Sequence, residues 1–240
     1  MSTRQHRGRG SRVLLGIFAL LCTAAPGRAQ EQPHLHFPRP QGVFDFEMSA
    51  GVTLLTVPRD IAEEEINKAP ALDLDAVIGL PWQFSFHGRA IVQYITNEFR
   101  FGASWSHSFG RFGIAAGDDA SFWFGAMTID GFDNSMSGWM NYPYVAVGYD
   151  ADGVLISLKG EAMLMLAQRS FAGENDLGSN RNAIAGGAVT VMLEQPFWKN
   201  THLALGARIS LTQFHPQTWF AFSAFSRRLL FSELILGVIL

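Results

Sequence analysis

Strict alternation of apolar and polar residues, sustained over segments of ten residues or more, is the feature that most constrains this fold. Between residues 43 and 56, phenylalanine, methionine and aliphatic side chains alternate with acidic, hydroxyl-bearing and glycine residues. A period of two places these two classes on opposite faces of a β-strand. The pattern returns in residues 71–80, 84–95, 98–108, 154–167 and 201–212.

The length and composition of these segments favour strands that cross a membrane. Soluble strands average about 5–6 residues, whereas a tilted strand needs roughly 9–11 residues to span a bilayer. The polar face is rich in glycine and serine, which suits a crowded lumen, and aromatic residues gather towards the segment ends. Charged residues make up only 16% of the chain, less than the roughly 25% of an average soluble domain.

On this pattern, residues 43–240 resemble a Gram-negative outer-membrane β-barrel. The resemblance implies an all-β fold, a single antiparallel up-and-down transmembrane barrel. It also implies outer-membrane lipid and the barrel-assembly machinery as partners. The alternation continues to the final residue, Leu240, similar to the C-terminal assembly signal of such barrels, which usually ends in Phe or Trp.

We count about ten strands. Eight or twelve are alternatives, and residues 117–120 in particular could form a hairpin turn. With a periplasmic N-terminus, four of the five outer connections are long, notably 57–70 and 169–183, and every periplasmic turn is short, as in outer-membrane barrels. The expected strands are 43–56, 71–80, 83–95, 98–108, 111–128, 141–149, 153–168, 184–195, 201–214 and about 223–240.

The N-terminal region predicts export. Four arginines precede the apolar run 13–23, and small residues follow it, so residues 1–29 match a cleaved signal peptide. Five of the 18 basic residues lie in this segment, which leaves 13 against 21 acids and argues against nucleic-acid binding. Residues 30–42 predict an extended periplasmic lead-in, in which His34 and His36 are solvated rather than metal ligands.

Charges of both signs fall on the face that we assign to the lumen. A barrel of ten strands is close to the size that its own side chains fill, and unpaired buried charge is costly. We therefore expect a salt-bridged lumen, in a barrel that is either structural or a narrow, porin-like channel. The expected lumen charge network comprises Asp75, Arg89, Glu98, Arg100, Asp119, Lys159, Glu161, Glu194 and Arg208.

The short turns predict a strand register, because antiparallel partners across a hairpin have a constant sum of residue numbers. The predicted partners are Asp75 with Arg89, Arg100 with Asp119, Lys159 with Tyr144, and Glu194 with His202. The same faces predict that Phe46, Leu74, Phe101, Leu158 and Leu205 point to lipid, and that Ser104 and Ser210 point into the lumen.

Two other classes of function remain open from the sequence. An outer-membrane hydrolase acting on lipid would need a His and Ser that meet, but neighbours in Ser106-His107-Ser108 point to opposite faces of a strand. A peptide hydrolase would draw on Asp118, Asp119, Asp130 and His215, whose spacing carries no specificity. A periplasmic lipocalin-like binding barrel is the weaker alternative. No cofactor or metal site is predicted, the Asx-rich loop 172–180 is expected to be solvated rather than to bind calcium, and any small-molecule ligand is unknown.

Overall fold

The computed structural model describes residues 33–58, 68–129, 132–198, 201–221 and 228–240. The predicted signal peptide, residues 1–29, lies outside these residues. Within the part of the chain that is described, no helix is long and apolar enough to cross a membrane. The strands are β1 (Phe46–Thr56), β2 (Lys68–Gly79), β3 (Phe84–Val92), β4 (Thr96–Phe109), β5 (Phe112–Ile129), β6 (Phe132–Ala151), β7 (Val154–Ala172), β8 (Asn175–Trp198), β9 (Thr201–Thr212) and β10 (Leu229–Ile239).

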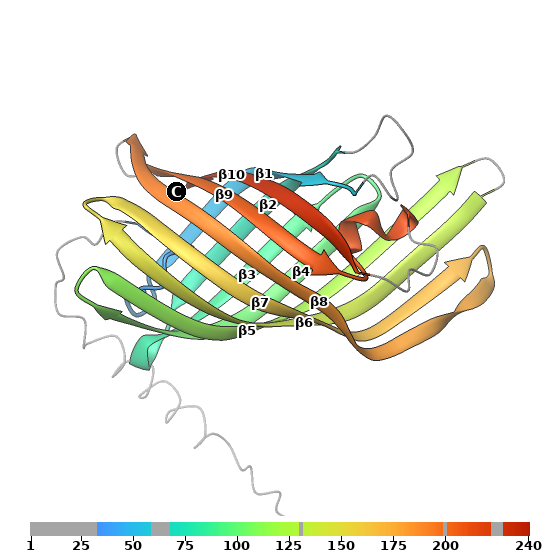
Figure 1. The fold of residues 1–240 in the computed structure, drawn as a ribbon, viewed down its shortest axis with the longest axis horizontal. Helices are drawn as coiled ribbons and strands as arrows, with labels where there is room; N and C mark the ends of the chain where they lie inside the picture. Colours follow the sequence, from blue (N-terminus) through green and yellow to red (C-terminus); the bar gives the residue numbers. More distant parts are fainter. Residues whose placement is uncertain (1–32, 59–67, 130–131, 199–200, 222–227) are drawn as a thin grey trace, which may run out of the picture. The chain divides into compact units, whose positions relative to one another are not determined.

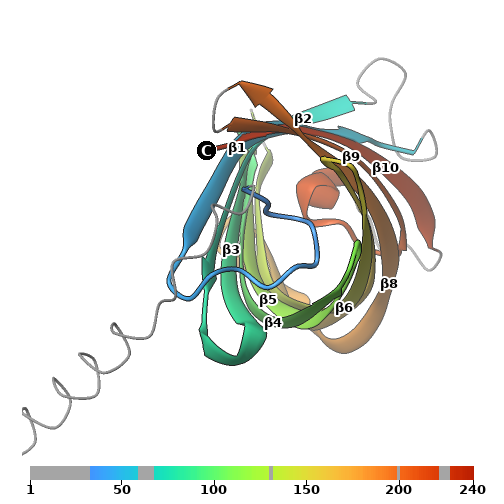
Figure 2. The same cartoon turned by 90° about the vertical axis from the view of Figure 1, so that its left-hand side faces the viewer.

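The ten strands of the described residues close into one antiparallel barrel (Figures 1 and 2). Each strand pairs with its neighbours in sequence, and β1 closes the sheet by pairing with β10 from Ser49↔Ile239 to Thr56↔Ser232. Closure leaves no unpaired edge around the wall, which is the condition for placing a sheet in lipid. The prediction of an up-and-down barrel with ten strands is confirmed, and β5 runs unbroken through residues 117–120.

The two faces of the strands separate as the alternation predicts. All five residues predicted to point to lipid are exposed on the outer surface, among them Phe46 at 60% and Phe101 at 55%. Ser104 and Ser210, predicted for the lumen, are buried. The outer surface is therefore apolar, and polar side chains line much of the inner face of the wall.

Aromatic side chains form two belts on the outer surface. Near the short turns, the rings of Phe109, Phe112 and Tyr149 follow one another at centroid distances of 6.1 and 5.0 Å. Towards the other end, Phe122 lies 5.0 Å from Trp139. Ten residues separate Phe112 from Phe122 along β5, which at the usual strand rise and tilt is about 25 Å, the height of the apolar band of outer-membrane barrels.

One acidic side chain interrupts the outer apolar band. Asp118 is exposed on the outer face of β5, six residues from each of Phe112 and Phe124. Its Oδ1 accepts a hydrogen bond from Asn141 Nδ2 on β6 at 2.7 Å. Asp118 therefore lies between the two aromatic belts, within the band that faces hydrocarbon.

The predicted outer loops are shorter than expected. Residues 129–140 and 169–183 were expected to be loops, but β5 pairs with β6 as far as Ile129↔Phe132, and β7 pairs with β8 as far as Ala172↔Asn175. The sequences of these segments are polar and rich in glycine, so they lack the alternation that marks the other strands. No face of the sheet has to be apolar there, because these parts of the strands lie beyond the lipid. The tips of these hairpins project beyond the rest of the wall in Figure 1. Of the other long loop, 57–70, residues 59–67 lie outside the described residues, and β2 begins at Lys68.

Candidate functional site: the lumen

The N-terminal segment 33–42 runs through the lumen at the end that carries the short turns (Figure 2). The backbone N–H groups of Leu35 and His36 donate to Glu194 Oε1 at 3.2 and 2.5 Å. Arg39 Nη2 pairs with Asp150 Oδ2 at 3.1 Å. The structure thus places this segment inside the barrel, where the sequence analysis expected a solvated lead-in.

Packing explains why the segment enters the barrel. Phe37 and Pro38 lie against Gly148, where a Cβ atom would overlap both of them. Leu35 packs on the buried cluster that includes Met192 and Ile235. Apolar residues at alternate positions of this proline-rich segment were the only sequence signal for the burial. Burial lowers the pKa of His36, and the Glu194 carboxylate acts in the opposite direction.

A second segment fills the lumen from the opposite end. Residues 213–221, which include the 3-10 segment η2 (Pro216–Ala221), fold back into the barrel after β9. Gln217 Nε2 donates to Glu98 Oε2 at 2.9 Å, and His215 Nε2 lies 3.2 Å from Glu233 Oε1. The sequence analysis treated this region as an outer loop and a strand, and did not identify its inward fold.

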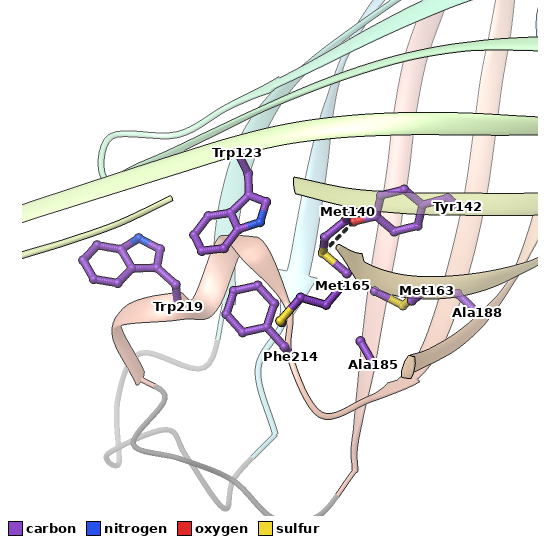
Figure 3. Close-up of a cluster of buried hydrophobic side chains, with 9 residues drawn as sticks. All are labelled: Trp123, Met140, Tyr142, Met163, Met165, Ala185, Ala188, Phe214 and Trp219. Atoms are coloured by element: carbon purple, nitrogen blue, oxygen red, sulfur yellow. Dashed lines mark hydrogen bonds between the residues drawn. The ribbon is translucent and has the colours of Figure 1, made fainter. Parts of the chain in front are cut away.

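Beneath η2 the lumen is apolar (Figure 3). The Trp123 and Phe214 rings lie 4.9 Å apart, and the Tyr142 hydroxyl oxygen lies 3.2 Å from Met140 Sδ. Methionines suit this irregular space because their side chains adapt to it. The buried members of the cluster are Trp123, Met140, Tyr142, Met163, Met165, Ala185, Ala188, Phe214 and Trp219.

A chain of ion pairs crosses the middle of the lumen. Lys159 Nζ lies 3.4 Å from Asp119 Oδ2 and 3.5 Å from Glu161 Oε2. Arg208 then joins Glu161 on β7 to Glu233 on β10 through its two terminal nitrogens. These contacts connect β5, β7, β9 and β10, and they cross-link the walls of the barrel.

A further set of polar contacts, which joins these ion pairs through Arg100, is centred on Glu98. Its Oε1 accepts hydrogen bonds from Arg100 Nε at 2.7 Å, Ser121 Oγ at 2.9 Å and the Tyr142 hydroxyl at 3.1 Å. The Arg100 guanidinium lies 4.0 Å above the Tyr142 ring and 3.9 Å from Glu161 Oε1. Every oxygen of the buried Glu98 therefore has a donor, since Gln217 supplies the other.

A separate cluster lies on β2 and β3. Arg89 donates through Nε and Nη2 to Asp73 at 2.8 and 2.5 Å, and Thr53 donates to the same carboxylate at 2.6 Å. Asp75 lies farther from Arg89, at 3.6 Å. The sequence paired Arg89 with Asp75, yet the diagonal neighbour Asp73 takes the short contacts because the long Arg side chain reaches along the strand.

Of the four predicted cross-strand pairs, one is in register. Asp75 is the partner of Arg89 on β2 and β3. The predicted pair of Arg100 and Asp119 is wrong by two residues, because Asp119 is opposite Gly102. The turn lies at 110–111 rather than 109–110, with Gly110 in the left-handed region at a φ of 63°.

The other two predicted pairs are also displaced by two residues. Tyr144 is opposite Glu161 instead of Lys159, because Asp152 and Gly153, both with positive φ, form the turn. An Asp-Gly pair favours this two-residue turn, and that signal was available in the sequence. Glu194 is opposite Ala204 instead of His202. Since a shift of two preserves the face, all the side chains stay in the lumen.

The residues considered for hydrolysis do not come together. Ser106 points inward, whereas His107 lies on the outer face, stacked on Trp105 at 5.9 Å. His215 is buried beneath η2, Asp118 faces outward, and Asp130 lies outside the described residues. The 172–180 segment, weighed as a calcium loop, forms a β-hairpin. Among the residues that the structure describes, no three His, Cys, Asp or Glu side chains are arranged to hold a metal ion.

A chamber of about 150 Å³ remains between the N-terminal segment and the ion pairs. Leu35, His36 and Arg39 line one side of it, and Lys159 and Arg208 line another. A volume of this size has room for several water molecules. It is a part of the lumen that could hold a polar solute.

Comparison with known proteins finds likeness only among solved structures. No protein-family model and no curated protein matches the chain. The alignment with Neisserial surface protein A covers 81% of this chain and 96% of that protein, with 14% sequence identity and a TM-score of 0.39. The alignment with the translocator domain of the autotransporter NalP from Neisseria meningitidis covers 83% of this chain and 88% of that domain, with 10% identity and a TM-score of 0.43. The alignment with Ail of Yersinia pestis covers 83% of this chain and 100% of that protein, with 10% identity and a TM-score of 0.38.

Likeness at this level concerns barrel architecture alone. The closed antiparallel wall, the apolar outer band and the two aromatic belts are properties of this chain itself. The described residues have the architecture of a Gram-negative outer-membrane β-barrel.

Proposed function

We propose that this chain is exported and resides in the outer membrane as a structural barrel that is closed to solute flow. The observation that carries the proposal is the occupation of the lumen from both ends. Residues 33–42 fill it at the short-turn end, and residues 213–221 fill it at the other. Outer-membrane lipid would surround the apolar band, after insertion by the barrel-assembly machinery.

The ion pairs support a closed state. A conducting path would have to pass Arg208, which joins Glu161 to Glu233, and Arg100, which is held by Glu98. Separating one partner from a buried ion pair costs about 3–5 kcal/mol, because the other charge is left uncompensated. Opening the barrel would require several such losses together.

The alternatives have less support. A narrow channel would need a continuous aqueous path, and a hydrolase would need His107 to face one of the neighbouring serines. A periplasmic lipocalin-like barrel would not expose an apolar band with Phe46, Phe101 and Leu230 at its outer surface. The hairpins of β5–β8 instead present a polar tip beyond the band, with residues 173–181 exposed, where a structural barrel would meet its surroundings.

Conductance across a planar lipid bilayer tests the proposal. We expect the purified barrel to give no single-channel steps, while the unheated protein migrates as a compact folded species on a gel. Heat-modifiable migration of the protein recovered from lipid vesicles checks that the barrel has folded in the bilayer, so that the absence of steps does not reflect a failure to insert. Stable conductance steps from the unmodified barrel would contradict the closed state and favour the narrow channel.

A further inference from the structure

The chamber in the lumen is lined by more cations than anions. Among the described residues that line it, five carry a positive charge and three a negative charge. The basic side chains are Arg39, Arg89, Arg100, Lys159 and Arg208, and the acidic ones are Asp75, Asp119 and Glu161.

Three arginines of the wall each have a carboxylate partner that does not itself line the chamber. Arg89 is held by Asp73, Arg100 by Glu98 and Arg208 by Glu233. None of these three acids lines the chamber, although each arginine does. Each of these guanidinium groups is therefore fixed by a carboxylate outside the lining, and Arg208 is paired as well with Glu161, which lines the chamber.

The acids that do line the chamber are already engaged. Asp119 contacts His87 and Lys159, and Glu161 contacts Lys159 and Arg208. Asp75 lies 3.6 Å from Arg89. These carboxylates offset part of the positive charge, but the cations of the wall still outnumber them.

Some donor groups of the wall residues have no acceptor among the described residues. Arg208 Nε is buried and has no hydrogen-bond partner among the described residues. Arg89 uses Nε and Nη2 for Asp73, which leaves the Nη1 group. The hydroxyl-bearing residues Ser157 and Thr190 line the same space. A buried donor without an acceptor is costly, and an acceptor-rich ligand would remove that cost.

We propose that this chamber binds a small oxyanion of the carboxylate or phosphate class. Guanidinium groups match the planar or multidentate oxygens of such anions, and the hydroxyl groups supply further donors. Residues of the segment 35–41, at the short-turn end, form part of the chamber wall. The inference does not depend on the barrel being closed to ions, since binding and conductance are measured separately.

Titration of the lipid-free barrel in detergent tests the inference. Sodium phosphate and sodium succinate are the probes, and sodium chloride at equal ionic strength is the reference. We expect saturable heat in calorimetry and a saturable rise in the thermal unfolding midpoint with at least one probe. Removal of one charged donor in Lys159→Met should weaken binding by about tenfold or more.

Two further variants distinguish binding in the chamber from binding elsewhere on the barrel. Ser157→Met fills the space without changing any charge, so it should abolish binding even if Lys159→Met does not fold. Arg111→Met removes an exposed cation outside the chamber and should bind as the unmodified protein does. Absence of saturation with both probes, equal binding in Ser157→Met, or saturation only with phosphate-bearing lipid would overturn the inference.

Discussion

Replacement of Arg208 by methionine probes the cross-link between the walls of the barrel. Arg208 is 3% exposed and joins Glu161 to Glu233, which are also buried. In the variant, Glu161 keeps Lys159 at 3.5 Å and Arg100 at 3.9 Å, whereas Glu233 keeps only His215 at 3.2 Å among the described residues. Only one of the two carboxylates, that of Glu233, is thus left poorly compensated. We therefore expect the free energy of unfolding to fall by about 3 kcal/mol, the lower end of the range for breaking a buried ion pair.

Equilibrium unfolding in urea, with the barrel in phosphatidylcholine vesicles, measures this loss. Arg111→Met is the matched control, because Arg111 and its partner Asp152 are 55% and 78% exposed and such pairs contribute less than about 1 kcal/mol. Addition of Glu233→Gln to Arg208→Met should restore most of the free energy of unfolding. Equal losses in Arg208→Met and Arg111→Met, or no restoration by Glu233→Gln, would refute the reasoning.

Three further predictions concern the surface of the barrel. Leu205→Arg on the outer face should lower the free energy of unfolding in vesicles by about 2–4 kcal/mol, whereas a matched change at an exposed position outside the band, Leu177→Arg, should not. Asp118→Leu should raise the free energy of unfolding by about 1 kcal/mol, because it removes a carboxylate that faces hydrocarbon. A loss of stability would contradict the placement of Asp118 in the apolar band. Protease added to intact cells should cut the β7–β8 hairpin at its tip, residues 173–174, rather than throughout 169–183. Cleavage at 152–153 would show that the barrel has the opposite orientation in the membrane.

Periodicity predicted the wall of the barrel well because the lipid acts on every second residue. Phe46, Leu158 and Leu205 had to be apolar on one face, and this requirement is visible in a single sequence. Beyond the membrane that requirement ends, and the strands of β5–β8 in 129–140 and 169–183 were taken for loops. Register was predicted less well, since it depends on where each two-residue turn lies, as at Asp152 and Gly153.

The contents of the lumen were harder to predict than its wall. Alternation identified inward charges such as Glu98 and Arg208, but which acid meets which arginine depends on diagonal reach, as for Arg89 and Asp73. The alternation of the strands carries no information on the burial of 33–42 and of 213–221, because neither segment belongs to the sheet. The positions of these two segments depend on the shape of the lumen, and that shape is known only once the barrel is closed.

Protection of residue 37 from a membrane-impermeant thiol reagent tests the closed lumen most directly. Phe37 is 4% exposed, so in a Phe37→Cys variant that also carries Cys22→Ser we expect no labelling of the folded barrel and full labelling after heating. Asp152→Cys in the same background, at an exposed turn, should label without heating. Rapid labelling of Phe37→Cys in the folded barrel would show that the N-terminal segment lies outside the lumen and would contradict the account.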